Sequence, residues 1–204
     1  MTGHYPPIAD HGLIGDLQTC ALVSAAGSLD WFCSPRFDSP SVFAALLDAE
    51  RGGHFTITAE APGSTVHQLY LADSAILVTR FLTADGVGEV IDCMPIDRPT
   101  DPSSRHRILR GIRVVRGSVT FTMECRPRFD YGRRPHELDL DSQGMARFHG
   151  AGLAGYLQAV GPVSLERDGQ DATARITLHA GELACCSPWT TPRPSRPIRW
   201  TGRG

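Results

Sequence analysis

The sequence predicts an all-β protein, an antiparallel β-sandwich. Short runs rich in β-branched and aromatic residues recur along the chain, and turns containing glycine separate them. Several runs alternate apolar with polar residues, as in 121–125 and 174–178, which is typical of a sheet with one solvated face. A convincing helical pattern occurs once, near residues 40–48. Many short strands with a single helix favour a sandwich.

The expected strands are joined in sequence by tight turns. Runs 19–24 and 29–33 flank Ala26-Gly27, and a further run, 54–58, comes after Gly52-Gly53. Ala84-Asp85-Gly86 joins two runs and predicts a hairpin, because Asp and Gly tolerate positive φ. The runs that flank this and later glycine turns are 75–83 with 87–94, 108–115 with 119–125, 138–141 with 145–149, and 163–166 with 172–178.

The predicted helix begins with two favourable residues. Ser39 is a suitable N-cap, and Pro40 would occupy the first helical position, where its missing N–H costs nothing. Apolar residues then recur at helical spacing at positions 42, 43, 46 and 47. Gly52-Gly53 would lie just beyond its end.

The last twenty residues have a different character. Residues 1–184 form the expected sandwich domain, whereas 185–204 contain four prolines, four arginines and no acid, so an irregular tail is predicted. One hypothesis is a shifted reading frame, because codons for Ala184-Cys185-Cys186 and the next few residues can encode an apolar strand in another frame. The alternative is a natural, disordered tail rich in proline and arginine.

Composition limits the classes of partner and compartment. The chain has 204 residues and a net charge of −2, which gives no case for binding nucleic acid or an acidic membrane surface. It contains no apolar run of the roughly 20 residues that cross a bilayer, and no signal peptide pattern. Its six cysteines show neither Cys-x-x-Cys nor zinc-finger spacing, so we expect mostly buried thiols and a cytoplasmic location.

One corner of the sequence gathers candidate binding residues. Asp30 and Trp31 lie in a predicted strand, and Arg36, Phe37 and Asp38 lead into the predicted helix. An aromatic face can stack on a sugar while Arg and Asp bond its hydroxyls. The favoured alternative is structural: both aromatic rings lie in the core and the arginine pairs with an acid. A third interpretation is that the corner docks onto another domain.

A second candidate is the basic and aromatic segment 126–134. It contains Arg128 and Tyr131, which can contact a phosphate or a carbohydrate. Such a segment more often connects strands at the surface or docks a partner.

Other chemistry is weakly supported. Acids stand out at positions 16, 30, 38, 85, 89 and 92, but none can be paired from sequence alone. Gly150, Gly152 and Gly155 fit a dinucleotide pattern, yet no helix is expected after them, so no cofactor is predicted. The eight histidines form no metal-binding motif, so no metal is predicted either.

Three segments resemble one known family. These segments, which cover 14–40, 81–92 and 126–132, include Gly27-Ser28-Leu29-Asp30-Trp31 and Pro35-Arg36-Phe37-Asp38-Ser39-Pro40. They are similar to the N-terminal domain of bacterial family 15 glycoside hydrolases, the trehalase-like and glucoamylase-like enzymes.

The resemblance implies a fold and a role. It implies a large β-sandwich of the supersandwich type that precedes a helical barrel, and the two catalytic glutamates belong to that barrel. We therefore expect no catalytic residue in this chain, a catalytic helical barrel domain as its absent partner, and an α-glucoside as the substrate of the parent enzyme, hydrolysed with inversion.

Two alternatives remain. One is an independent carbohydrate-binding module that uses Trp31, Phe37 and Arg36. The weaker one is a self-sufficient hydrolase.

Overall fold

The computed structural model describes residues 6–96, 106–150, 152–186 and 189–191, and within them the chain is almost entirely β-structure. A short 3₁₀ helix, η1 (Ile8–Asp10), precedes the strands. The strands are β1 (His11–Gly15), β2 (Cys20–Ser24), β3 (Ser28–Cys33), β4 (Ser41–Phe43), β5 (His54–Ala59), β6 (Thr65–Tyr70), β7 (Leu77–Leu82), β8 (Gly86–Cys93), β9 (His106–Arg126), β10 (Glu137–Leu140), β11 (Met145–Gly150), β12 (Leu153–Val160), β13 (Glu166–Asp168), β14 (Asp171–His179), β15 (Leu183–Cys186) and β16 (Trp189–Thr191).

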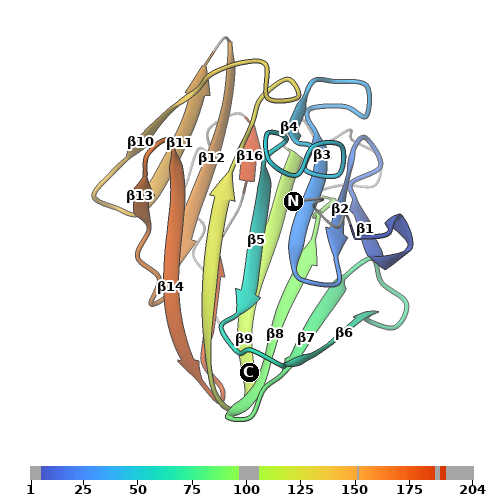
Figure 1. Ribbon diagram of the computed structural model, residues 1–204, viewed down its shortest axis with the longest axis vertical. Coiled ribbons are helices and arrows are strands. Elements are labelled where there is room, and N and C mark those ends of the chain that lie inside the picture. Colours follow the sequence, from blue (N-terminus) through green and yellow to red (C-terminus); the bar gives the residue numbers. More distant parts are fainter. Residues whose placement is uncertain (1–5, 97–105, 151, 187–188, 192–204) are drawn as a thin grey trace.

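The strands form two antiparallel layers joined by one long strand (Figure 1). The first sheet contains β1 to β5, the C-terminal half of β9, β14 and β13. The second sheet contains β6, β7, β8, the N-terminal half of β9, β15 and β16, β12, β11 and β10. The predicted all-β sandwich is confirmed.

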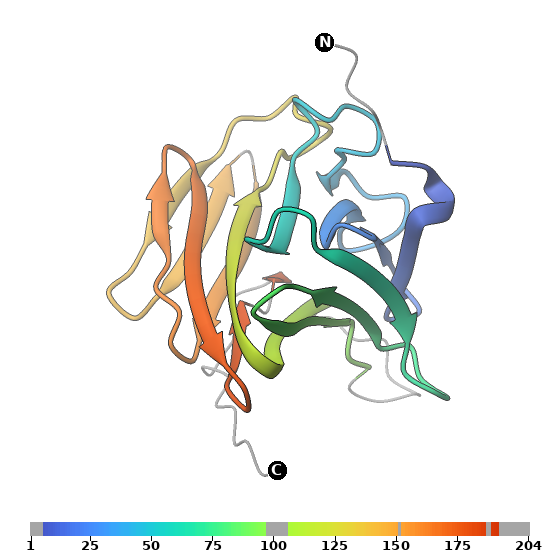
Figure 2. The ribbon, with the colours of Figure 1, turned by 60° about the horizontal axis from the view of Figure 1, so that its bottom comes forward.

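Strand β9 passes from one sheet to the other without a break. Its residues 109–117 pair with β8, and its residues 118–125 pair with β14. Figure 2 shows the strong curvature of β9 where it leaves one sheet for the other. The prediction of a turn between two strands at 116–118 is therefore wrong. Gly117 has φ +71°, which allows the backbone to bend at this point. The segments on either side of it remain paired with neighbouring strands, so they form one bent strand.

The predicted helix at 40–48 is also wrong. Residues 41–43 form β4, in which Phe43 pairs with Phe32 of β3, and a turn comes next. The backbone carbonyls of Ser41 and Val42 accept hydrogen bonds from Asp130 and Arg128. These carbonyls are thus used in tertiary bonds rather than in helical ones, and a buried β-branched valine suits a strand.

Other sequence predictions find their place in the fold. Strands β7 and β8 form the hairpin expected around Asp85, with Leu82 opposite Val87. The boundary predicted at 184 falls inside β15, where Cys186 is fully buried. Of the predicted tail, residues 187–188 and 192–204 lie outside the described residues.

A single apolar core lies between the sheets. Phenylalanines from both layers meet in it, and the rings of Phe81 and Phe121 are 6.1 Å apart in an edge-on arrangement. All six cysteines lie in the described residues and none of them forms a disulfide; three are buried. Burial raises the pKa of Cys186 to about 12, so this thiol stays protonated and packs as an apolar side chain.

Candidate functional site

A buried ion pair ties the two sheets together. Asp92 of β8 and Arg110 of β9 are both fully buried, and Arg110 Nε donates to Asp92 Oδ1 over 2.8 Å. The same guanidinium donates to the carbonyls of Gly27, at 2.8 Å, and Phe55, and lies 4.8 Å from the Phe55 ring centroid. Asp92 is therefore committed to a structural network, as buried charges generally are.

Asp16 holds the turn between β1 and β2. Its Oδ2 lies 2.6 Å from His106 Nδ1, and both side chains are buried. Its Oδ1 accepts the backbone N–H groups of Gln18 and Thr19 at 3.1 and 2.9 Å. The carboxylate thus satisfies backbone donors that the turn leaves open.

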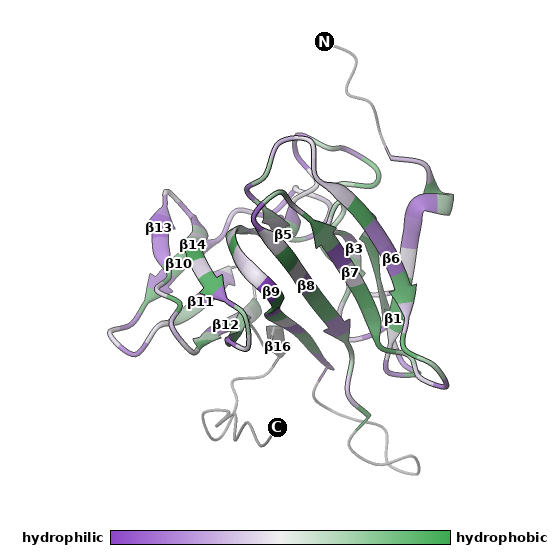
Figure 3. Cartoon of the chain, turned by 90° about the horizontal axis from the view of Figure 1, so that it is seen from below, coloured by the Kyte–Doolittle hydropathy of each residue, from purple (hydrophilic) through white to green (hydrophobic). Residues whose placement is uncertain are grey.

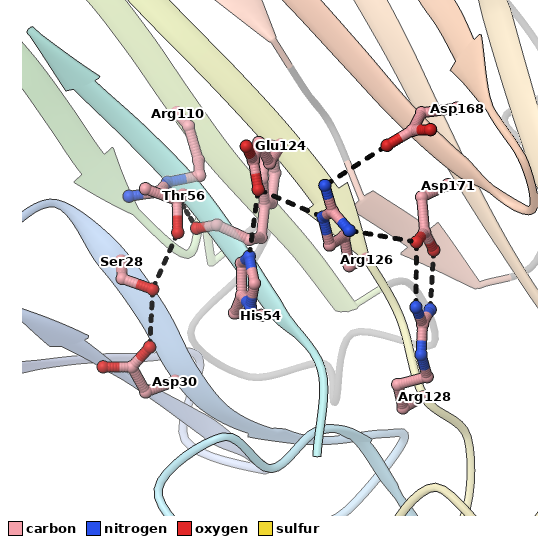
Figure 4. A network of polar contacts seen from close by, with 11 residues as sticks. Ser28, Asp30, His54, Thr56, Arg110, Glu124, Arg126, Arg128, Asp168 and Asp171 are labelled. Atoms are coloured by element: carbon pink, nitrogen blue, oxygen red, sulfur yellow. Dashed lines mark hydrogen bonds and ion pairs between the residues drawn. The ribbon is translucent and has the colours of Figure 1, made fainter. Parts of the chain in front are cut away.

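Asp30 is buried beside the N-terminal strand. Its Oδ2 lies 3.1 Å from His11 Nε2, and its Oδ1 accepts a 2.5 Å bond from Ser28 Oγ. Thr56 Oγ1 donates to Ser28 Oγ over 2.9 Å, which extends the chain of contacts to β5 (Figure 4). Both oxygens of Asp30 are therefore engaged with other side chains of the domain.

Charged side chains cross the outer face of the first sheet near the end of β9 (Figure 4). Arg128 forms a bidentate pair with Asp171, at 2.6 and 2.8 Å, and these bonds raise the pKa of Arg128. Arg126 joins Glu124 at 3.0 Å and Asp168 at 3.2 Å. Arg128 thus fastens the segment after β9 to β14.

Trp31 and Tyr131 meet although one hundred positions separate them. Their ring centroids are 6.2 Å apart, with the planes inclined at 47°. Tyr131 adopts φ +60°, and its backbone N–H is held by Ser41 Oγ at 2.9 Å. Burial raises the pKa of the Cys33 thiol, while a hydrogen bond with the Tyr131 hydroxyl acts in the opposite direction.

The segment after β3 projects from the molecule. Arg36 and Asp38 form a bidentate pair at 3.0 and 3.2 Å, and both side chains are exposed. Such surface pairs contribute little to stability. Phe37 between them is 60% exposed. The expectation that Phe37 lies in the core is therefore wrong, whereas the pairing of Arg36 with an acid is confirmed.

Apolar side chains gather in the loops at this end of the first sheet. Leu17 and Leu47 are 79% and 62% exposed, like Phe37. Two hydrogen bonds hold the loops of these residues to β3: Thr19 Oγ1 donates to the carbonyl of Cys33, and Leu46 N–H donates to the carbonyl of Asp30. Exposed apolar groups at one end of a domain are typical of an interaction surface.

The candidate site therefore divides into separate parts. The structure brings together Trp31 and Tyr131, keeps Arg36, Phe37 and Asp38 on an exposed loop, and places Asp30 and Arg128 in structural networks. Among the described residues, no group of three or more His, Cys, Asp or Glu side chains is arranged to hold a metal ion. Within the same residues, no helix has the length and hydropathy needed to span a membrane.

Sequence reasoning missed the basic partners of the acids. Neither His106 nor Arg110 stands out in the sequence as a candidate, yet each lies buried against an aspartate. A signal was present for Arg110, because a charged residue at an apolar position of an alternating strand needs a partner.

The chain is similar to known proteins along most of its length. The family model described as "Trehalase-like, N-terminal" matches residues 1–186. A trehalase of Mycolicibacterium smegmatis is 41% identical over an alignment of 144 positions, which covers 63% of this chain and 21% of the relative. A trehalase of Mycobacterium tuberculosis is 31% identical over an alignment of 201 positions, which covers 87% of this chain and 29% of the relative. A trehalase of Thermoplasma volcanium is 32% identical over an alignment of 145 positions, which covers 69% of this chain and 23% of the relative. The chain thus spans less than a third of the length of these relatives.

Proposed function

Because the chain belongs to the trehalase-like N-terminal domain family, we propose that it is a non-catalytic sandwich that supports the helical catalytic barrel of a family 15 glycoside hydrolase. The parent enzyme would hydrolyse an α-glucosidic bond with inversion, and the relatives named trehalase favour trehalose as its substrate. The catalytic glutamates would lie in the barrel.

The proposal rests on the partners of the buried acidic side chains. Hydrolysis of a glycosidic bond needs two carboxyl groups on either side of the bond, one of them poised to donate a proton. Asp16, Asp30 and Asp92 instead lie buried against His106, His11 and Arg110. Glu89 is likewise buried between two arginines. A carboxylate held in this way stabilises the fold and has no open side on which to receive a sugar.

A reconstitution experiment tests the role. The 204-residue chain is assayed with trehalose alone and after mixing with the remainder of the Mycolicibacterium smegmatis trehalase, from which the segment similar to this chain has been deleted. We expect no turnover by the chain alone, and binding together with gain of trehalase activity in the mixture. Turnover by the chain alone that is lost on Asp30→Asn or Asp38→Asn would overturn the proposal.

One observation favours a second function, direct contact with an α-glucoside. Tyr131 is 41% exposed and contacts Trp31, and Phe37 is exposed on the loop that also carries Arg36. Aromatic rings and a guanidinium are therefore available to a sugar. Calorimetry with trehalose and maltose separates the two functions. A carbohydrate-binding module shows heat that is lost on Tyr131→Ala, whereas silence at millimolar sugar leaves the supporting role.

We also propose a cytoplasmic location. Its support is chemical, since six cysteines that form no disulfide, three of them buried, suit a reducing compartment.

A further inference from the structure

The outer faces of the two sheets differ in chemistry. On the first sheet, the outward positions of β5, β9 and β14 carry hydroxyls and charges: Thr56, Thr58, Thr122, Glu124 and Arg175. The burial of β14 alternates accordingly along the strand. This face is suited to water.

One row of positions on the outer face of the second sheet is apolar. Cross-strand partners share one face of a sheet, so the register defines a row that runs across six strands. The row consists of Leu69, Val78, Ile91, Gly111, Cys185 and Val160. Figure 3 shows apolar residues along β7 and β8, and the burial of β7 does not alternate as that of β14 does. Val78 of this row is already buried within the chain, whereas Leu69 is 40% exposed, and exposed apolar side chains suit a contact surface.

A hollow interrupts the row at Gly111. It has a volume of about 200 Å³ and is lined by Gly111, Val160, Leu183 and Cys185 among others. A Cβ atom built on Gly111 would meet nothing closer than 3.8 Å, so the glycine leaves unfilled space above the sheet. An apolar side chain of a partner can occupy this hollow.

A charged group lies beside the hollow in the next row. Glu89 of β8 is fully buried, and Arg80 and Arg113 bind it from the neighbouring strands at 2.6–2.7 Å. The two arginine side chains are themselves 43% and 46% exposed. The group carries a net charge of +1, and each guanidinium keeps further N–H donors. A partner that covers them must therefore offer an acceptor, ideally a carboxylate.

We propose that this outer face of the second sheet, which we call the dry face, is where the catalytic helical domain docks. The inference rests on the proposed function and names its interface. The docked domain places an apolar side chain in the hollow over Gly111 and a carboxylate against Arg80 and Arg113.

Two further observations favour this partner. The segment similar to this chain is 21% and 29% of two relatives, so most of each relative lies outside that segment. The family model ends at residue 186, in β15, whose Leu183 and Cys185 line the hollow. In a relative, the next segment therefore begins beside the dry face.

The test uses the full chain and the same remainder of the Mycolicibacterium smegmatis trehalase, with binding measured by calorimetry. Gly111→Leu fills the hollow, and we expect binding about tenfold weaker or more, with Gly111→Ala intermediate. Arg113→Gln removes one charge from the group and should weaken binding about fivefold. Thr122→Leu, on the outward face of the other half of β9, is the matched control and should bind within about twofold of the unaltered chain. Thermal melts of each variant verify folding.

The outcomes separate the two proposals. If the unaltered chain does not bind the remainder, the proposed function itself fails. If it binds, and the Gly111 variants bind equally well, the dry face is not the interface and the supporting role stands. A dimer of the chain that Gly111→Leu abolishes would assign the face to a second copy and overturn the commitment to the helical domain.

Discussion

His136 is packed between Phe129 and Phe148, with ring centroids 5.6 and 5.8 Å away, and its burial lowers the pKa of the imidazole. Its Nε2 donates to the carbonyl of Gln170 over 2.9 Å, which the neutral ring can do. Because the folded pKa lies below the unfolded value near 6.5, the unfolded chain takes up the proton first as the pH falls. The stability from this group is complete above about pH 6.5 and decreases below it.

This residue gives the first prediction. The contribution of His136 to the free energy of unfolding in urea should be lower at about pH 5.5 than at about pH 7.5, with a slope of at most about 1.4 kcal/mol per pH unit. His136→Gln retains a donor for Gln170 and should flatten the dependence over this range. His67→Gln, at an exposed position, should leave it unchanged. Equal slopes in all three proteins would contradict this account of His136.

The candidate site shows which residue contacts a sequence can predict. Arg36 and Asp38 are two positions apart, so their pairing is accessible to local reasoning. Trp31 and Tyr131 come together only because residues 128–130 bond to β4, a contact that no local pattern encodes. The structural alternative places Phe37 in the core because aromatic residues usually are buried, but its side chain is 60% exposed on its loop.

At the scale of single elements, the bend of β9 depends on Gly117. Its φ of +71° is unfavourable for any residue with a Cβ, and a Cβ there would lie 2.0 Å from the carbonyl oxygen of Asp85. Gly117→Ala should therefore destabilise the protein by more than about 3 kcal/mol, since strain and a backbone clash add. Gly144→Ala is the control, because it has φ +76° but open space, and should cost about 1 kcal/mol. Urea titrations measure both, and equal losses would show that the bend tolerates a side chain.

The strands and turns differ in how far the sequence alone predicts them. Alternation of apolar and polar residues predicted β14 and both halves of β9, and Asp85-Gly86 predicted the hairpin of β7 and β8. Glycine at positive φ is common to turns and to bends within strands, so Gly117 could not distinguish the two. Residues 42–47 fit a helical pattern, but tertiary bonds to residues 128–130 decided the conformation.

At the scale of the whole molecule, the two sheets should unfold as one unit. β9 contributes backbone hydrogen bonds to both, Arg110 joins them through Gly27 and Phe55, and the core cluster runs from Ile14 to Cys186. Neither sheet can open without exposing the shared core, so an intermediate with one intact sheet is unfavourable. Native-state hydrogen exchange should give the same free energy of opening for Val90 in the second sheet and Met123 in the first. The exposed strand β13 should exchange through a smaller, local opening. Separate free energies for Val90 and Met123 would mean that β9 does not couple the layers and that each sheet is a cooperative unit of its own.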